Sequence, residues 1–206
     1  MNGNLEIIIG PMFSGKSTEI IRKIRLLQKI DKKILVVKPT IDNRYINDKI
    51  TSHNYESVDC ILVNNLFDIN DKVISEHDTV VIDEGQFFQD LVVTITRWLN
   101  TFNINIIVAG LDGDFECKPI GQILNLIPLS NECVKLNSLC NICKDGTKAP
   151  FSFRLDQSRE TILVGGSDKY IPLCRKHYNE LLKLTMENQT MENQTMKNQT
   201  MENQSY

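Results

Sequence analysis

One eight-residue motif near the N-terminus constrains the fold of this chain more than any other feature. It fits the pattern G-x-x-x-x-G-K-[S/T], follows the continuous apolar run Leu5–Ile9 and precedes Ser17–Lys29, where apolar residues recur at helical spacing. In a loop between a buried strand and a helix, backbone N–H groups and the positive end of the helix dipole point at phosphate. The sequence therefore predicts a phosphate loop that binds ATP with Mg²⁺. Its residues are Gly10, Pro11, Met12, Phe13, Ser14, Gly15, Lys16 and Ser17.

The rest of the N-terminal part alternates between predicted strands and helices. Apolar runs predict buried strands at Ile34–Val37, Cys60–Val63, Thr79–Ile82 and Ile104–Ala109, and Asp90–Asn100 has the apolar spacing of a helix. Repeated strand–helix–strand units form parallel sheets through right-handed crossovers. We therefore expect an α/β fold, a P-loop (RecA-like) parallel sheet flanked by helices.

Side chains suited to phosphoryl transfer come from the phosphate loop and from a second acidic segment. Lys16 is expected to reach the β- and γ-phosphates, and the Ser17 hydroxyl to join the Mg²⁺ ligands. Asp83 and Glu84 follow Thr79–Ile82, and the carboxyl end of a central strand faces the phosphate loop in this architecture. Asp83 is expected to hold Mg²⁺, and Glu84 to accept a proton from an acceptor hydroxyl. Glu84 could instead activate water, which would make the protein an ATPase.

Paired metal-ligand spacings occur in the C-terminal part. Cys140-x-x-Cys143 and Cys174-x-x-His177 are separated by 30 residues. Two chelating pairs suit a tetrahedral Zn²⁺ ion, and four protein ligands leave no open position, so a structural zinc is expected. The alternatives are four free residues or a disulfide.

These features predict three parts of the chain. Residues 1–138 form the nucleotide-binding domain, with a last strand at Val134–Leu139, and residues 139–184 form a small zinc-stapled lobe with a helix at Arg175–Lys183. Residues 185–206 repeat a five-residue unit, T-M-E/K-N-Q, whose single apolar residue fits neither helix nor strand spacing. We expect this tail to be disordered.

Charge and hydropathy exclude some partners. The net charge of −3 argues against a protein whose main partner is nucleic acid. No signal peptide is visible, and no apolar stretch approaches the ~20 residues needed to span a bilayer. We therefore expect a cytoplasmic protein with neither a nucleic-acid nor a membrane partner.

Five segments together resemble the type II thymidine kinase family, which includes cytosolic, poxviral and bacterial enzymes. They are GPMFSGKST (Gly10–Thr18), DEGQFF (Asp83–Phe88), LDGDF (Leu111–Phe115), KPIGQILNLIPL (Lys118–Leu129) and GGSDKY (Gly165–Tyr170). The resemblance extends from about Leu5 to Tyr178. It implies transfer of the ATP γ-phosphate to the 5′-hydroxyl of thymidine, giving dTMP and ADP, by a homotetramer.

The resemblance also implies site residues. Glu84 would be the general base for the 5′-hydroxyl, Phe115 would stack near the base, and Tyr170 would contact the sugar or close the site. The positions that it assigns to the nucleotide, beside the phosphate loop, are Asp42, Asn43, Arg44, Asp83, Glu84, Gly85 and Gln86. Those that it assigns to thymidine are Phe115, Ser152, Thr161, Ile162, Leu163, Val164, Gly165 and Tyr170, most of them in a loop of the zinc lobe. Met12 and Phe88 would be pocket walls, although ordinary packing is the alternative for Phe88, Phe115 and Tyr170.

Two other functions fit part of this pattern. A RecA-type DNA-dependent ATPase shares the phosphate loop and the acidic strand end, but the negative charge and the short chain disfavour it. A zinc-ribbon binding module with a degenerate nucleotide site is the second. The intact Lys16, Ser17, Asp83 and Glu84 argue against degeneracy.

Overall fold

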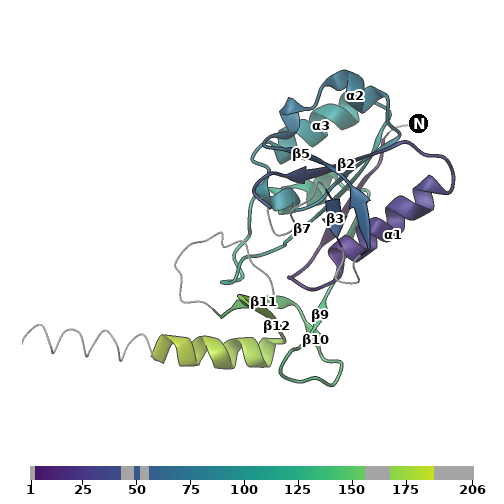
Figure 1. Cartoon of the computed structure of the whole chain (residues 1–206). Helices are drawn as coiled ribbons and strands as arrows, with labels where there is room; N and C mark the ends of the chain where they lie inside the picture. Colours follow the sequence, from purple (N-terminus) through teal and green to yellow (C-terminus); the bar gives the residue numbers. More distant parts are fainter. Residues whose placement is uncertain (1–2, 43–48, 52–55, 156–167, 188–206) are drawn as a thin grey trace, which may run out of the picture.

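A six-stranded parallel sheet with helices on both faces forms the larger part of the molecule, and a smaller lobe adjoins it (Figure 1). The computed structural model describes residues 3–42, 49–51, 56–155 and 168–187. Every neighbouring pair of strands in this sheet is parallel. The predicted α/β fold is therefore confirmed.

The strand order determines which loops meet at one edge of the sheet. Across the sheet the strands are β5 (Ile61–Val63), β2 (Ile34–Pro39), β6 (Thr79–Ile82), β7 (Asn105–Gly110), β1 (Leu5–Ile9) and β8 (Glu132–Lys135). In the register, Ile9 of β1 lies beside Gly110 of β7, and Ile82 of β6 lies beside Val108. The carboxyl ends of β1 and β6 therefore lie at one edge, separated by one strand, with their backbones about 10 Å apart.

Burial on both faces explains why β1 reads as a continuous apolar run. Leu5, Ile7 and Ile9 pack into one hydrophobic cluster, and Ile8 packs into a second cluster on the opposite face. The charged residue of this strand, Glu6, is only 8% exposed and pairs with Lys23 of α1 at 2.7 Å. The strand therefore has no solvent face that would favour polar alternation.

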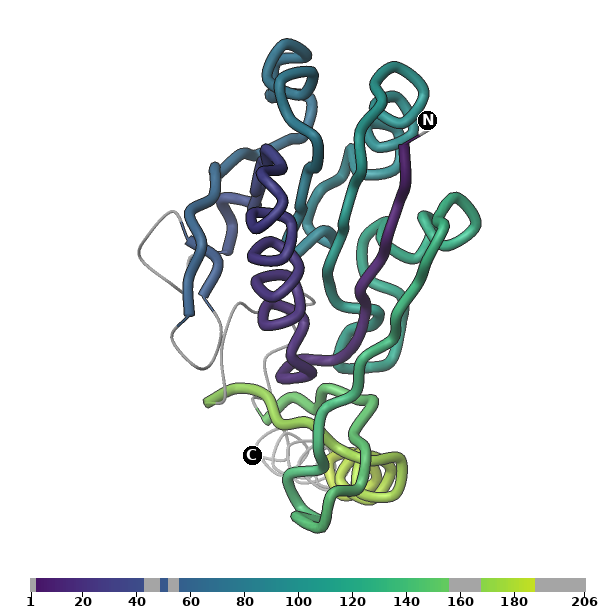
Figure 2. Tube along the Cα trace, turned by 90° about the vertical axis from the view of Figure 1, so that its right-hand side faces the viewer, coloured from purple at the N-terminus to yellow at the C-terminus, as the bar shows by residue number. Residues whose placement is uncertain are grey.

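Helices cover the two faces unequally. One face is covered by α1 (Lys16–Gln28) and the antiparallel pair β3 (Lys49–Thr51) and β4 (Ser57–Asp59). The opposite face is covered by η1 (Leu66–Asp68), α2 (Asp71–Ser75), α3 (Leu91–Thr101) and η3 (Ile123–Leu129), and η2 (Gly85–Phe87) follows β6. Figure 2 shows α1 lying along the sheet, with its N-terminal end toward the smaller lobe. The phosphate loop, which precedes α1, therefore lies at the end of the sheet that is next to the smaller lobe.

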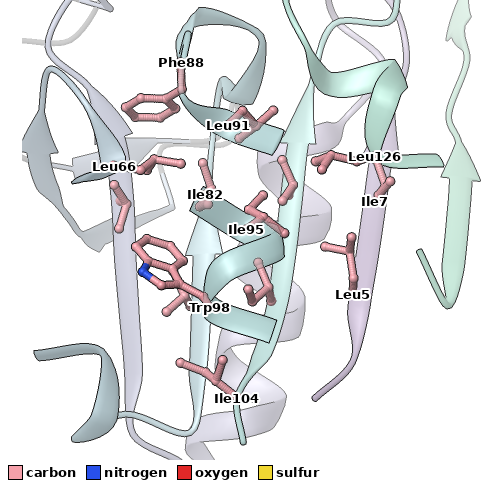
Figure 3. Packing of buried hydrophobic residues seen from close by; sticks show 14 of the residues in the cluster. Leu5, Ile7, Leu66, Ile82, Phe88, Leu91, Ile95, Trp98, Ile104 and Leu126 are labelled. Carbon is pink, nitrogen blue, oxygen red and sulfur yellow. The ribbon is translucent and has the colours of Figure 1, made fainter. Parts of the chain in front are cut away.

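The larger hydrophobic cluster lies between the sheet and α3 (Figure 3). Leu91, Ile95 and Trp98 of α3 are 0% exposed, as their helical spacing predicts. Phe88 is also 0% exposed and belongs to this cluster, near Leu66. For Phe88 the alternative of ordinary packing therefore holds, and a role as a pocket wall is wrong.

The smaller lobe consists of two short antiparallel ribbons and a helix. The ribbons pair β9 (Ser138–Leu139) with β10 (Lys148–Ala149) and β11 (Phe151–Arg154) with β12 (Tyr170–Leu173), and the helix covers residues 175–187. One continuous strand at Val134–Leu139 is a wrong prediction, because β8 ends at Lys135 and the chain leaves the sheet before β9. The helix continues past Lys183 into the first three residues assigned to the tail, and residues 188–206 lie outside the described part.

Within the described residues, no helix is both long enough and apolar enough to cross a membrane.

We expect Trp98→Ala to reduce the free energy of unfolding by about 3–5 kcal/mol, because it removes a buried ring and leaves a cavity. Urea denaturation measures the change. Val93→Ala on the same helix is the matched control: Val93 is 56% exposed, and its loss should cost no more than about 0.5 kcal/mol. Equal losses in the two variants would contradict the described packing of α3.

Candidate active site

The phosphate loop connects β1 to α1 and has the backbone angles of an anion cradle. Gly10 and Gly15 have φ of 152° and 85°, and Phe13 has φ of 62°. At Gly10 a Cβ atom would lie 2.5 Å from the carbonyl oxygen of Leu136, so a larger residue would collide with the chain that leaves β8. The sequence motif therefore corresponds to a loop conformation that requires glycine at Gly10.

The amino group of Lys16 lies within the phosphate loop. Its Nζ atom donates hydrogen bonds to the carbonyl oxygens of Pro11, at 2.7 Å, and Gly10, at 3.1 Å. The residue is 8% exposed, so its charge is largely removed from water. A buried ammonium group at this position suits an anionic ligand such as the phosphates of a nucleotide.

The acidic pair lies at the end of β6, as predicted. Asp83 and Glu84 are 3% and 7% exposed, and the backbone N–H of Glu84 donates to Oδ1 of Asp83 at 3.0 Å. Glu84 has φ of 53° and ψ of 40°, a left-handed conformation that costs a non-glycine residue about 1–3 kcal/mol. Strain of this kind is concentrated at functional sites, which supports a functional role for this glutamate.

Gln86 holds the carboxylate of Glu84 in one orientation. Its Nε2 atom donates to Oε2 of Glu84 at 2.6 Å, and its Oε1 atom accepts from the backbone N–H of Leu111 at 3.0 Å. Gln86 is 2% exposed, and a Cβ atom at Gly110 would clash with its Oε1. Sequence reasoning assigned Gln86 to the nucleotide, whereas the structure shows its side chain bound to Glu84 and to the end of β7.

The segment after β2 contributes a buried ion pair. Asp42, predicted to bind nucleotide, pairs with Nζ of Lys38 at 2.9 Å, and both side chains are at most 3% exposed. Lys38 was not predicted as a site residue, because a lone lysine at a strand end matches no motif. Asn43 and Arg44 lie outside the described residues.

The lobe contacts the phosphate loop directly. The backbone N–H of Met12 donates to Oγ of Ser152, in β11, at 2.9 Å. A cleft of about 130 Å³ lies at this junction. Its lining residues include Pro11, Asp112, Lys135 and Ser152. Ser152 therefore lies beside the phosphate loop, and its hydroxyl oxygen accepts from the loop backbone.

Two further residues assigned to thymidine meet at this junction. Phe115 lies under the guanidinium of Arg154, 3.8 Å from its carbon to the ring centroid, and Tyr170 accepts a hydrogen bond from the same guanidinium. Arg154 was missed by sequence reasoning, although its spacing from Ser152 on a strand places the two on one face. Residues 161–165, assigned to thymidine, lie outside the described residues.

The four predicted metal ligands lie together in the lobe. Their ligand atoms all lie within 4.8 Å of one another, and the members of the cluster are Cys140, Cys143, Cys174 and His177. The Sγ atoms of Cys143 and Cys174 are 3.9 Å apart, and Nδ1 of His177 lies 3.3–3.5 Å from the three sulfurs. A tetrahedral Zn²⁺ site has S···S of about 3.8 Å and S···N of about 3.5 Å, calculated from its bond lengths. The cluster therefore has the dimensions that fit zinc.

The thiols of the Cys140–Cys143 pair differ in pKa. Burial opposes ionisation of the Cys140 thiol, but backbone N–H groups of Cys143 and Cys174 lower its pKa to about 6. Burial and the neighbouring Cys140 thiol raise the pKa of Cys143 to about 11. Without a bound cation Cys140 and Cys143 would therefore not ionise together near neutral pH, whereas a divalent metal stabilises its cysteine ligands as thiolates.

A phosphate loop lies at the same sheet edge as a strained, hydrogen-bonded glutamate, an arrangement typical of the P-loop class of phosphate-binding proteins. Comparison with known proteins identifies the family. The thymidine kinase family profile matches residues 3–178. The chain is 43% identical to the thymidine kinase of Vaccinia virus (strain Western Reserve) over 176 residues, which are 85% of this chain and 97% of that protein.

Other relatives agree with this result. The thymidine kinase of Sheeppox virus (strain KS-1) is 45% identical over 177 residues, or 85% of this chain and 97% of that protein. The cytosolic thymidine kinase of Gallus gallus is 39% identical over 176 residues, or 85% of this chain and 77% of that protein. The chain therefore belongs to the thymidine kinase family, and the enzyme is a kinase.

We expect Gln86→Leu to lower kcat by about tenfold to a hundredfold, because the Glu84 carboxylate loses the bond that orients it. Steady-state kinetics measure the effect. Gln122→Leu is a matched control: Gln122 donates to the carbonyl oxygen of Gln89 and accepts from the backbone N–H of Val92, and neither bond involves Glu84. A kcat loss of the same size in both variants would contradict a specific role for Gln86.

Proposed function

We propose that the enzyme transfers the γ-phosphate of ATP to the 5′-hydroxyl of thymidine, giving ADP and dTMP, a precursor for DNA synthesis. The observation that carries this proposal is the position of Glu84 at the end of β6, held by Gln86 at the sheet edge that the phosphate loop shares. A fixed carboxylate near a phosphate cradle suits proton removal from an acceptor alcohol during phosphoryl transfer. The names of the viral and avian relatives support thymidine as this acceptor.

The roles of the other residues follow from their positions. The phosphate loop would bind the ATP phosphates through its backbone N–H groups, and Lys16 would exchange its two carbonyl partners for phosphate oxygens. The Ser17 hydroxyl and Asp83 would hold Mg²⁺, which neutralises charge that develops on the phosphates. Gly85 directly follows Glu84, the proposed catalytic base. The ion pair between Asp42 and Lys38 would support the part of the site that binds ATP. Asn43 and Arg44 stay proposed phosphate contacts.

The nucleoside side is proposed to come from both parts of the chain. Phe115 follows β7 and would stack on the base, whereas Ser152 and Tyr170 belong to the β11–β12 ribbon. The segment Thr161–Gly165 would present backbone groups to the edge of the base. A site that hydrogen-bonds a polar edge rejects bases with another pattern, because its buried groups would be left unpaired.

The Cys/His cluster is proposed to hold one structural Zn²⁺. Cys140 and Cys143 come from the end of the β9 segment, and Cys174 and His177 from the start of the terminal helix. Nε2 of His177 lies 3.9 Å from a carboxylate oxygen of Glu180, too far for a direct hydrogen bond. Four protein ligands leave no position for a substrate, so the role of the metal is structural.

A cytoplasmic location and a homotetramer complete the proposal. The chicken relative is called cytosolic by name, which supports the location. Analytical ultracentrifugation of the purified protein tests the assembly, because a tetramer would sediment at about four times the chain mass of 23.6 kDa.

Glu84→Gln should lower kcat by about 10²–10⁴-fold, because the amide cannot accept the proton of the hydroxyl. Binding of ATP, measured by calorimetry, should stay close to that of the unmodified enzyme. Glu76→Gln, an exposed substitution after α2, is the control and should leave kcat unchanged. ADP release is measured in the presence of thymidine, in the presence of DNA and in the absence of both. A rate of Glu84→Gln with thymidine close to that of the unmodified enzyme would exclude Glu84 as the general base.

Removal of one metal ligand should lower the zinc content and loosen the lobe. We expect about one equivalent of zinc per chain in the unmodified protein and a large loss in Cys143→Ser, with faster cleavage of the lobe by protease. Cys133→Ser is the matched control, because Cys133 is an exposed thiol outside the cluster. Elemental analysis showing less than about half an equivalent in the unmodified protein would contradict the four-ligand site.

A further inference from the structure

A buried arginine of the lobe meets the loop that follows β7. Arg154, the last residue of β11, is 6% exposed. Its guanidinium carbon lies 3.8 Å from the centroid of the Phe115 ring and 5.3 Å from that of Tyr170. Its Nη2 atom also donates a hydrogen bond to the Tyr170 hydroxyl at 2.8 Å. One side chain therefore touches both aromatic residues that the proposed function assigns to thymidine.

The sheet register explains how Arg154 reaches both rings. Arg154 and Tyr170 are directly paired across the antiparallel ribbon. Side chains two residues apart on a strand share a face, so Ser152 projects to the same side as Arg154. Ser152 binds Met12 of the phosphate loop on this side, and Arg154 covers Phe115. This face of β11 therefore contacts two loops of the larger domain, the phosphate loop after β1 and the loop after β7.

A second residue of the lobe fixes the backbone of Phe115. The Tyr178 hydroxyl donates to the carbonyl oxygen of Phe115 at 2.7 Å. The rings of Phe151 and Phe153 pack on Tyr178 at centroid distances of 5.1 and 5.9 Å. Tyr178 therefore holds the backbone of Phe115, and Arg154 lies over its ring.

The chemistry of this contact favours arginine specifically. A planar guanidinium stacks on an aromatic face and still donates hydrogen bonds in its own plane, whereas the compact ammonium of lysine cannot do both. Burial of a charge is unfavourable unless such contacts compensate for the lost water. A plain packing role would be served better by an apolar side chain of similar size.

We propose that Arg154 is a positioning residue for the nucleoside: it fixes the ring of Phe115 and the hydroxyl of Tyr170 in the arrangement that binds thymidine. This proposal rests on the proposed function, in which Phe115 and Tyr170 contact the nucleoside. Because Arg154 acts through these two residues, its loss should raise KM for thymidine and leave KM for ATP unchanged.

The test compares the Michaelis constants of the two substrates in Arg154→Lys. KM for thymidine should rise about tenfold, the size expected when a desolvated guanidinium–aromatic stack is lost, with KM for ATP unchanged. Arg97→Lys is the matched control: the Arg97 guanidinium lies over Phe67, 5.7 Å from the ring centroid, and binds Asp71 at 2.8 Å, away from the phosphate loop. This control should leave both constants unchanged.

A double-mutant cycle with Phe115→Leu separates positioning from general stability. Arg154→Lys should raise KM for thymidine by a smaller factor in the Phe115→Leu background than in the unmodified enzyme, because the ring is gone and only the contact with Tyr170 remains to be lost. Arg154→Met fills a similar volume without a buried charge, and it repeats the cycle if the lysine variant does not fold.

The outcomes distinguish this proposal from the proposed function. Fully additive effects, an unchanged KM for thymidine, or parallel increases in both constants with a lowered melting temperature would overturn the role of Arg154. Absence of thymidine-dependent ADP release in the unmodified enzyme would instead overturn the proposed function. A thymidine-specific, non-additive increase supports both.

Discussion

The parallel alignment of β1, β7 and β6 is the constraint on which the rest of the site depends. Because the three strands run in one direction, the loop after β1, the glutamate after β6 and the end of β7 all lie at one edge. The middle strand separates the other two by about 10 Å, so the phosphate loop and Glu84 leave the sheet from strands that are not direct neighbours. It also provides the backbone N–H of Leu111 that holds Gln86, so the proposed base is oriented from the strand between it and the phosphate loop.

The site also depends on the contact between the larger domain and the smaller lobe. Ser152 binds the phosphate loop through Met12, and Arg154 with Tyr178 holds Phe115. Two-stranded ribbons are marginally stable alone, so β11 and β12 depend on what they pack against. Each side therefore limits the freedom of the other, and a ligand bound between them would stabilise both.

Local chemistry could be predicted from the sequence, whereas long-range contacts could not. Gly10 and Lys16 belong to a motif whose backbone requirements are local, and Cys140 with His177 follows metal spacing, so these groups were found from the sequence. Leu111, one partner of Gln86, is 25 residues away from it, and Tyr170, one partner of Arg154, is 16 residues away. Such pairs depend on strand register and on how the lobe meets the sheet, which periodicity does not specify. Phe88 was misassigned for the same reason, because a motif does not show which side of the sheet an aromatic ring packs on.

The Cys/His cluster is connected through the chain to the residues that we propose bind the nucleoside. Cys174 directly follows β12, whose first residue is Tyr170, and His177 precedes Tyr178 in the terminal helix. A metal that binds these ligands would fix the end of the ribbon and the first turn of the helix at one point. The same metal site would then restrain both Tyr170 and Tyr178. The Tyr170 hydroxyl binds Arg154, which lies over the Phe115 ring, and the Tyr178 hydroxyl binds the Phe115 backbone directly. If the cluster binds zinc and Phe115 binds the nucleoside, as proposed, the metal would influence nucleoside binding without contacting the substrate, because few residues separate its ligands from Tyr170 and Tyr178.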